Sequence, residues 1–410
     1  MRCGHHRGVP RLLLLLPSAT YRAPDFLEAA QRLDVEVVVG SEFRQALSES
    51  MGDRAVVVPL DDVDEALRAI VALDQRNKLD AVLAVDDQGV VVASLASAAL
   101  GLRHNPLDAV LASRDKTLMR GLFRAAALPQ PAYVVVAPGG DVVAAADEVG
   151  YPAVVKPVSR AASQGVIRVD DAAQAEMAGA RIRAILNNAP ENLLVESFVP
   201  GEEVAVEGLL RAGRLEVLAV FDKPDPLNGP FFEETIYVTP SRQAEGVLAD
   251  VTQIAAQAAT ALGLVEGPVH VELRIGPHSE VTVLELAARS IGGLCARSLR
   301  FGAGLSLEEL IIRHALGLEL DGLEREPGAS GVMMLPIHVG GVLEGVAGRE
   351  QARAVHGIVG LEITIAPGRP VVPLPEGDRY LGFIFARGAT PVEVEAALRR
   401  AQSKLDVRVR

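Results

Sequence analysis

The stretch at residues 269–293, VHVELRIGPHSEVTVLELAARSIGG, constrains this chain more than any other, because it places acidic side chains where a folded protein avoids them. Apolar and polar residues alternate from 269 to 275, which predicts a half-buried strand. Residues 276–280 predict a turn, and residues 281–286 predict a returning strand. A four-residue loop between the two strands would bring Glu272 directly opposite Glu285.

Two like charges that face each other across an antiparallel pair destabilise it unless something neutralises them. A divalent cation is the simplest candidate, and two solvated carboxylates on an exposed sheet face are the alternative. Arg289 and the glycine pair Gly292 and Gly293 follow closely in a segment of mostly small side chains. A cation, an arginine and exposed backbone at one place would hold phosphate oxygens together with a second anion.

Length and composition narrow the class of protein. A chain of 410 residues with 49% hydrophobic residues and 38 glycines predicts two to four lobes. Its net charge of -13, without clusters of Lys and Arg, argues against nucleic acid and anionic membranes as partners. The two cysteines, Cys3 and Cys295, are too few for a disulfide framework and are typical of a cytoplasmic protein. We expect Cys295 to be a small buried residue.

Residues 10–110 alternate apolar strands with helical stretches. The predicted strands are 12–16, 35–39, 55–58 and 81–85, with helices near 24–33 and 63–75 and a further segment near 44–50. Arg2 and Arg7 before the first apolar run mimic a signal peptide, but that run is too short for one and predicts a buried strand. The pattern predicts a Rossmann-like parallel sheet. Because no GxGxxG follows the first strand, dinucleotide binding is not expected.

Two polar stretches of this first half have ordinary explanations. Asp86 and Asp87 follow the strand at 81–85, where open sheets bind ligands, although helix N-caps are the commoner use of such residues. Residues 113–116, SRDK, open a helix that carries Arg120 and Arg124 on one side. A solvated basic face is the expected role of that side. Residues 129–131, Pro-Gln-Pro, predict a linker to a small separate lobe.

The small lobe carries two features that suit a nucleotide. An apolar strand at 153–155 delivers Lys156, and a loop with Ser163, Gln164 and Gly165 would let backbone N–H groups close over phosphate oxygens. A hairpin with a flexible tip would look the same, and the spacing of a Walker loop is absent. Further on, a strand ends in Glu196, and an apolar connector leads to Glu203. Such a connector suits adenine, and a carboxylate beside it suits the ribose hydroxyls.

Five stretches in a consistent order resemble the ATP-grasp family between residues 113 and 322: SRDK, YPAVVKP, LLVESFVPGEE, VHVEL and LELAAR. Within that family the chain is similar to the L-amino acid ligases, the dipeptide synthetases, at residues 222–241 and 331–348. The resemblance implies an α/β ATP-grasp fold with a Rossmann-like N-terminal domain at 1–112 and an ATP-grasp domain at 113–322 that contains a central antiparallel-sheet lobe. The ATP-grasp domain would include a lid at about 131–198, and an α+β C-terminal domain of the L-amino acid ligase type would follow at 323–410.

The resemblance also implies roles for individual residues. ATP phosphates would contact Lys116 and Lys156 under the 163–165 loop, while the adenosine pocket would be lined by Glu196, Phe198, Val199 and Glu203. Glu272 and Glu285 would hold Mg²⁺, with Mn²⁺ as a substitute, and Arg289 would bind the substrate carboxylate or an acyl phosphate. The amino-acid site would lie near His270, Glu234, Gly292 and Gly293. His270 is a candidate base, although a histidine that only satisfies a hydrogen bond would look the same.

The implied reaction joins a small-molecule carboxylate to an amine with release of ADP and phosphate, in a cytoplasmic homodimer. Many ATP-grasp enzymes have an asparagine two residues after the second metal glutamate, where this chain has Ala287, so a third protein ligand for a second Mg²⁺ is in doubt. A carboxylase or formate-activating enzyme of nucleotide biosynthesis is the main alternative, and a nucleotide-binding regulator without turnover is the other. We expect the C-terminal domain to be a cover without chemistry of its own.

Overall fold

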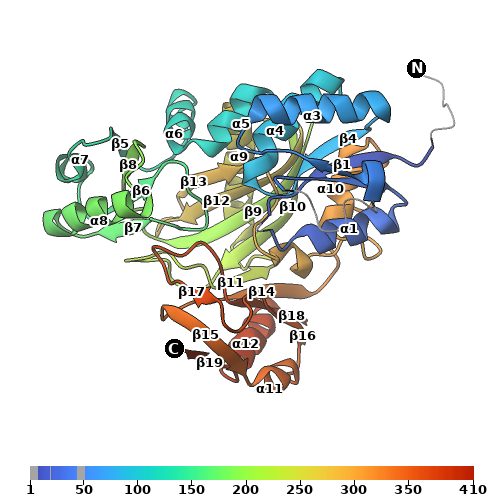
Figure 1. Cartoon of the computed structure of the whole chain (residues 1–410). Coiled ribbons are helices and arrows are strands. Elements are labelled where there is room, and N and C mark those ends of the chain that lie inside the picture. Colours follow the sequence, from blue (N-terminus) through green and yellow to red (C-terminus); the bar gives the residue numbers. More distant parts are fainter. Residues whose placement is uncertain (1–7, 19, 44–50) are drawn as a thin grey trace.

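The computed structural model (Figure 1) describes residues 8–18, 20–43 and 51–410. Arg2, Arg7, Cys3 and the predicted segment at 44–50 therefore lie outside the described residues. Among the residues described, no helix combines the length and the apolar character needed to cross a membrane.

The N-terminal domain is a parallel sheet with strand order β3-β2-β1-β4, as the alternating pattern predicts. Its strands are β1 (Arg11–Leu15), β2 (Glu36–Ser41), β3 (Ala55–Val57) and β4 (Ala81–Ala84). Helices α1 (Ala23–Arg32), α3 (Val63–Arg76), α4 (Val90–Leu100) and α5 (Leu107–Arg114) accompany it. Leu12 and Leu14 join one hydrophobic cluster and Leu13 and Leu15 another, so both faces of β1 are covered. This explains why β1 is apolar throughout.

Helix α6 (Lys116–Ala125) begins where SRDK predicts a helix, and Asp115 caps it by accepting hydrogen bonds from the N–H groups of Thr117 and Leu118. The expected solvated basic face is wrong for Arg120, whose side chain is only 1% exposed. It holds for Arg124, which is exposed and lies over the Tyr133 ring at 4.3 Å. Arg120 is buried because it extends under the lid.

The lid is a four-stranded antiparallel sheet with order β5-β8-β6-β7 and its own hydrophobic cluster. It projects to one side of the molecule in Figure 1. Its elements are β5 (Tyr133–Val136), α7 (Val142–Val149), β6 (Ala153–Pro157), β7 (Ile167–Val169), α8 (Ala172–Ile185) and β8 (Leu193–Ser197).

The central sheet has eight antiparallel strands in the order β13-β12-β9-β10-β11-β14-β18-β16. Those of the middle of the chain are β9 (Glu202–Arg211), β10 (Arg214–Lys223), β11 (Ile236–Thr239), β12 (Gly267–Ile275) and β13 (Val281–Ala287). The others are β14 (Ala329–Leu335), β16 (Ile358–Ile363) and β18 (Gly382–Gly388). Because β11 pairs with β14, the sheet runs without a break past the expected boundary at 322/323. The domain limits themselves stay a prediction.

Helices and a small sheet cover the central sheet. Helix α9 (Glu245–Leu262) packs on its β13 end, and α12 (Pro391–Gln402) packs on β14 and β18. The short η3 (Cys295–Ser298) and α10 (Leu307–Ala315) join it to the N-terminal domain. The remaining C-terminal elements are α11 (Arg349–Arg353) and a three-stranded sheet of β17 (Pro370–Val371), β15 (Gly341–Ala347) and β19 (Asp406–Val409).

The hairpin of β12 and β13 has the predicted pairing of Glu272 with Glu285, but it arises differently. A hydrogen bond from the N–H of Gly276 to the carbonyl of Glu280 leaves a turn shorter than the expected four residues. Pairing then runs from Ile275 with Val281 to Leu273 with Val283, where a β-bulge follows. The bulge leaves Leu284 without a cross-strand partner, which shifts the register by one residue and turns both glutamates toward the same face.

We expect the link between lid and central sheet to depend on Gly201, just before β9. Its φ is +121°, and a Cβ there would lie 2.1 Å from the carbonyl oxygen of Ile275. Gly201→Ala should therefore lower the free energy of unfolding by about 1–3 kcal/mol in urea denaturation. Gly246→Ala in α9, where a Cβ meets nothing within 4 Å, should leave stability unchanged or slightly raise it. Equal effects of the two variants would contradict this reading.

Candidate active site

One cavity of about 320 Å³ opens between the lid, the central sheet and the N-terminal domain. Elements far apart in the sequence line it, from Tyr21 before α1 to Tyr380 before β18. Most residues singled out in the sequence line this cavity: Lys116, Lys156, Ser163, Glu196, Phe198, Val199, Glu203, Glu234, His270, Glu272, Glu285, Arg289, Gly292 and Gly293.

Gln164 and Gly165, predicted to cover phosphates, do not line the cavity. The Gly165 N–H donates to the carbonyl of Pro375 at 2.9 Å, and the Gln164 side-chain amide donates to the carbonyl of Glu376 at 2.8 Å. Both groups therefore face the C-terminal domain. Ser163 alone of these three residues borders the cavity, together with its neighbours Ala161 and Ala162.

A buried ion network joins the lid to α6. Glu196, 3% exposed at the end of β8, accepts from Arg120 at 2.5 Å and lies 2.7 Å from Lys156 Nζ. Burial alone would raise the pKa of Glu196, but the charges of Arg120 and Lys156 lower it to about 2. The pKa of Lys156 is lowered because burial outweighs its attraction to Glu196. Arg120 also donates to the carbonyl of the bulged residue Leu284 at 2.7 Å, which links lid, helix and hairpin.

Lys116 bridges the hairpin and the loop before Ser163. Its Nζ donates to the carbonyl of Arg160 at 2.7 Å and lies 3.1 Å from Glu285. A second positive charge, Lys156, borders the same end of the cavity. Two lysines and a loop of small residues at one place form an environment suited to phosphate oxygens.

An aromatic and cationic wall continues from these lysines. Phe198 stacks on Phe232 with ring centroids 6.4 Å apart, and the guanidinium of Arg274 lies 5.1 Å from the Phe198 centroid. Arg274 also donates to Glu203 at 3.0 Å and to the carbonyl of Val199 at 2.7 Å. The flat apolar ring beside backbone groups suits a planar heterocycle.

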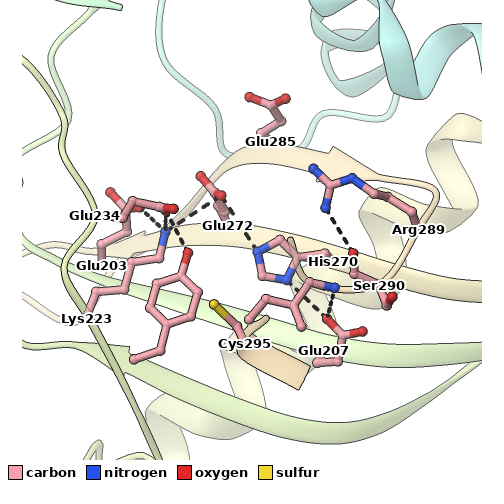
Figure 2. A network of polar contacts seen from close by, with 12 residues as sticks. Glu203, Glu207, Lys223, Glu234, His270, Glu272, Glu285, Arg289, Ser290 and Cys295 are labelled. Atoms are coloured by element: carbon pink, nitrogen blue, oxygen red, sulfur yellow. Dashed lines mark hydrogen bonds and ion pairs between the residues drawn. The ribbon is translucent and has the colours of Figure 1, made fainter. Parts of the chain in front are cut away.

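A cluster of carboxylates surrounds Lys223 on β10, which the sequence does not single out (Figure 2). Its Nζ lies 2.6 Å from Glu203 and 3.7 Å from Glu272, and it also contacts Glu234. Ligand oxygens of the three glutamates lie within 4.8 Å of one another, which is the spacing of a metal site, but the ammonium occupies their centre. Burial opposes the charge, yet the three carboxylates raise the pKa of Lys223.

The Glu272 and Glu285 side chains are 29% and 35% exposed into the cavity, and each has a lysine beside it. Burial would raise the pKa of Glu272, but Lys223 and His270 lower it, so the carboxylate is ionised. Carboxylate oxygens that face an open cavity are the ligand type that Mg²⁺ accepts. The residues present therefore fit a divalent cation.

His270 lies between two glutamates, Glu207 and Glu272. Its Nδ1 lies 3.1 Å from Glu207, and its Nε2 lies 3.7 Å from Glu272 (Figure 2). Glu207, 0% exposed, also accepts from the N–H of Ile291 at 2.9 Å. Burial lowers the pKa of His270, but the two carboxylates reverse this and raise it. The sequence does not reveal Glu207, because it stands in an apolar strand where only the fold shows which side chain it meets.

Arg289 is held by the N-terminal domain. Its Nε donates to Asp87 at 2.7 Å and its Nη1 donates to the carbonyl of Ser290 at 3.0 Å. Asp86 precedes a short 3-10 helix without capping it, so the N-cap interpretation is wrong and both aspartates border the cavity. Burial opposes the charge of Arg289, but Asp87 raises its pKa. The guanidinium is thus a fixed cation beside Gly292 and Gly293.

The far end of the cavity is lined by aromatic and sulfur-containing side chains. Glu234 accepts hydrogen bonds from Tyr237 at 2.6 Å and from Tyr380 at 3.2 Å. Cys295 is 2% exposed with its Sγ 3.5 Å from Met334 Sδ, and burial raises the pKa of its thiol, so it is a packing residue. The C-terminal domain is more than a cover, because it contributes Met334, Asp378 and Tyr380 to the lining.

Three family models match successive parts of the chain. Residues 27–104 match an ATP-grasp N-terminal domain, residues 149–298 an ATP-grasp domain and residues 333–410 an L-amino acid ligase C-terminal domain. Each match falls on a part of the chain that borders the cavity.

Individual proteins and solved structures that resemble the chain point to the same family of domains. The alanine–anticapsin ligase of Bacillus subtilis strain 168 is 26% identical over 269 residues, which are 61% of this chain and 56% of that protein. The chain thus spans less than two thirds of that ligase. The crystal structure of an L-amino acid ligase from Bacillus licheniformis superposes with a TM-score of 0.82 and 25% identity, covering 98% of this chain and 99% of that one. A carboxyaminoimidazole ribonucleotide synthase from Aspergillus clavatus, complexed with ATP, shares the fold with a TM-score of 0.75, 16% identity and coverage of 97% and 99%.

We expect Glu196→Gln to destabilise the protein by about 3–5 kcal/mol at pH 7, because Arg120 and Lys156 would lose their buried counter-charge. The folded-state pKa of about 2 lies below the ordinary 4.5, so the stabilisation is complete above 4.5 and is lost as the pH falls toward 2. Urea denaturation should therefore show the gap between wild type and variant closing over that range. Glu28→Gln, which removes an exposed ion pair with Arg32, is the control. A gap that is small or independent of pH would contradict this assignment.

Proposed function

We propose that this chain, which carries an ATP-grasp domain, is an ATP-dependent ligase that joins a carboxylate to an amine, with amino acids as substrates. One observation carries the proposal. A single cavity holds Lys116 and Lys156, the facing pair Glu272 and Glu285, and Arg289. These groups supply the charges that ATP and an activated carboxylate require.

ATP is the nucleotide that we assign to the lid end of the cavity. Lys116 and Lys156 would contact its phosphates beside Ser163, and the Phe198 and Val199 connector would hold the base. Glu203 would accept the ribose hydroxyls. Gln164, Gly165 and Glu196 would act around this site, since their contacts fix the loop and Lys156.

We assign Mg²⁺ to Glu272 and Glu285, whose carboxylates face each other at the cavity wall. When bound, the ion would neutralise phosphate charge and orient phosphate oxygens. Ala287 offers no third side-chain ligand on this strand.

The proposed chemistry has two steps. A substrate carboxylate oxygen attacks the terminal phosphorus of ATP, the bond to ADP breaks, and an acyl phosphate forms beside the guanidinium of Arg289. The amine of the second substrate then attacks the acyl carbon, phosphate leaves with the electron pair of the broken bond, and the amine loses a proton. His270 lines the cavity beside Glu272 and would accept that proton directly or through water, with Glu207 holding its ring.

Amino-acid substrates are supported by two features. The far end of the cavity offers Glu234 for an ammonium group and a wall of Tyr, Met and Cys side chains for an apolar substituent. The alanine–anticapsin ligase and the L-amino acid ligase are named for such substrates. The carboxylase alternative rests on structural neighbours such as the ribonucleotide synthase. Because the sequence identity to that enzyme is low, the likeness supports a shared fold alone. We also propose a homodimer and a cytoplasmic location, the latter on the scarcity of cysteine.

We expect Glu285→Gln to lower the rate of Mg²⁺-dependent ADP release at least about 100-fold, because one carboxylate of the metal pair would be lost. ADP release should be assayed with amino-acid pools and with hydroxylamine, which would trap the acyl phosphate as a hydroxamate. Glu216→Gln, on β10 and outside the cavity, is the control and should keep full activity.

The outcomes separate the hypotheses. Unchanged turnover in Glu285→Gln would show that the metal assignment is wrong. ADP release that needs bicarbonate or formate would favour the carboxylase or formate-activating alternative. ATP binding without turnover on any substrate would favour a nucleotide-binding regulator.

A further inference from the structure

A segment of the C-terminal domain reaches from the lid to the deep end of the cavity. We call residues 372–381, which connect β17 to β18, the strap. In Figure 1 this part of the chain leaves β17 and runs on the lid side of the molecule. A hydrogen bond from the N–H of Gly377 to the carbonyl of Pro373, 2.8 Å long, closes a tight turn in its middle. That turn fixes the direction in which Glu376 points.

The strap meets the lid through two groups of contacts. Arg181 on α8 donates from Nε and Nη2 to the two carboxylate oxygens of Glu376, at 2.6 and 2.9 Å. Gln164 and Gly165, in the loop after β6, donate to the carbonyls of Glu376 and Pro375. The guanidinium of Arg181 also lies 5.1 Å from the ring centroid of Phe231. The loop that carries Ser163 into the cavity is therefore anchored from outside the lid.

The other end of the strap belongs to the cavity itself. Asp378 and Tyr380 line it, and the Tyr380 hydroxyl donates to Glu234 at 3.2 Å. Only three residues separate Glu376, which contacts the lid, from Tyr380, which contacts Glu234 at the proposed amino-acid site. One short segment thus touches both substrate regions.

We propose that Glu376 is a positioning residue that holds the lid closed over the nucleotide, and that the strap couples this closure to the amino-acid end through Tyr380. The proposal rests on the proposed ligase function. An exposed ion pair alone contributes little, and Arg181 and Glu376 are 45% and 41% exposed. The bidentate ion pair and the two further hydrogen bonds act together, however, and all of them join the strap to the lid.

Closure matters because an acyl phosphate reacts with water. A lid that opens too often would let water attack the acyl carbon, so that ATP is consumed and no amide forms. The strap would hold the lid closed most firmly when an amino acid is bound beside Tyr380. Binding of the nucleotide and of the amino acid would then strengthen each other by the same factor.

The test is Glu376→Gln, which keeps the size of the side chain and removes its charge. We expect the KM for ATP to rise about 3- to 10-fold and the number of ADP molecules released per amide to rise above the wild-type value. A structural role alone would not raise that ratio. Arg181→Glu combined with Glu376→Arg should recover most of both losses. Glu350→Gln, which removes an exposed ion pair with Arg353 in the same domain, is the matched control.

A second measurement does not depend on turnover. Hydrogen exchange of the amides at 159–165, with a non-hydrolysable ATP analogue bound, should be faster in Glu376→Gln than in wild type and Glu350→Gln. If the wild type binds the analogue without forming an amide, the ligase proposal fails while this readout still tests the strap. Equal exchange and equal KM in Glu376→Gln and Glu350→Gln would overturn the proposal, and so would a charge swap that rescues nothing.

Discussion

The mutual repulsion of Glu272 and Glu285 is the constraint on which the site depends. The bulge at Leu284 brings them onto one face, and their charges need positive partners. Lys116 supplies one from α6, and Lys223 supplies another from β10. Because α6 also carries Arg120 to Glu196, the same demand for counter-charge draws the lid, the hairpin and the helix together. The cavity is the space that remains between these charged walls.

Much of the fold follows from local patterns. The parallel strands of the N-terminal domain are apolar throughout because helices cover both faces, and such runs are recognisable in a sequence. The hairpin of β12 and β13 shows its alternation just as clearly. The bulge escapes prediction, because the carbonyl of the bulged Leu284 accepts from Arg120, which lies 164 residues away in the sequence. A correct pairing thus came from an incorrect loop length.

The residues missed at the site share a physical reason. Lys223 and Glu207 look ordinary in the sequence, and only the fold shows their charged partners on other elements. Arg120 was misread for the same reason, because one face of α6 lies under a lid whose position no helical pattern reveals. Residues in motifs, such as Lys156 and Glu285, could be chosen for the site from the sequence, whereas their supports could not. Their individual roles remain proposals.

The two ends of the lid meet at one place. Tyr133 at its start pairs with Glu196 near its end, and the N–H of Ser197 donates to the carbonyl of Ala132 at 2.9 Å. The chain therefore enters and leaves this four-stranded unit through a narrow neck, as in an inserted module. Such a module can turn as one body while the sheet beneath it keeps its shape. An insertion within it would leave the central sheet unchanged, because its two ends lie side by side.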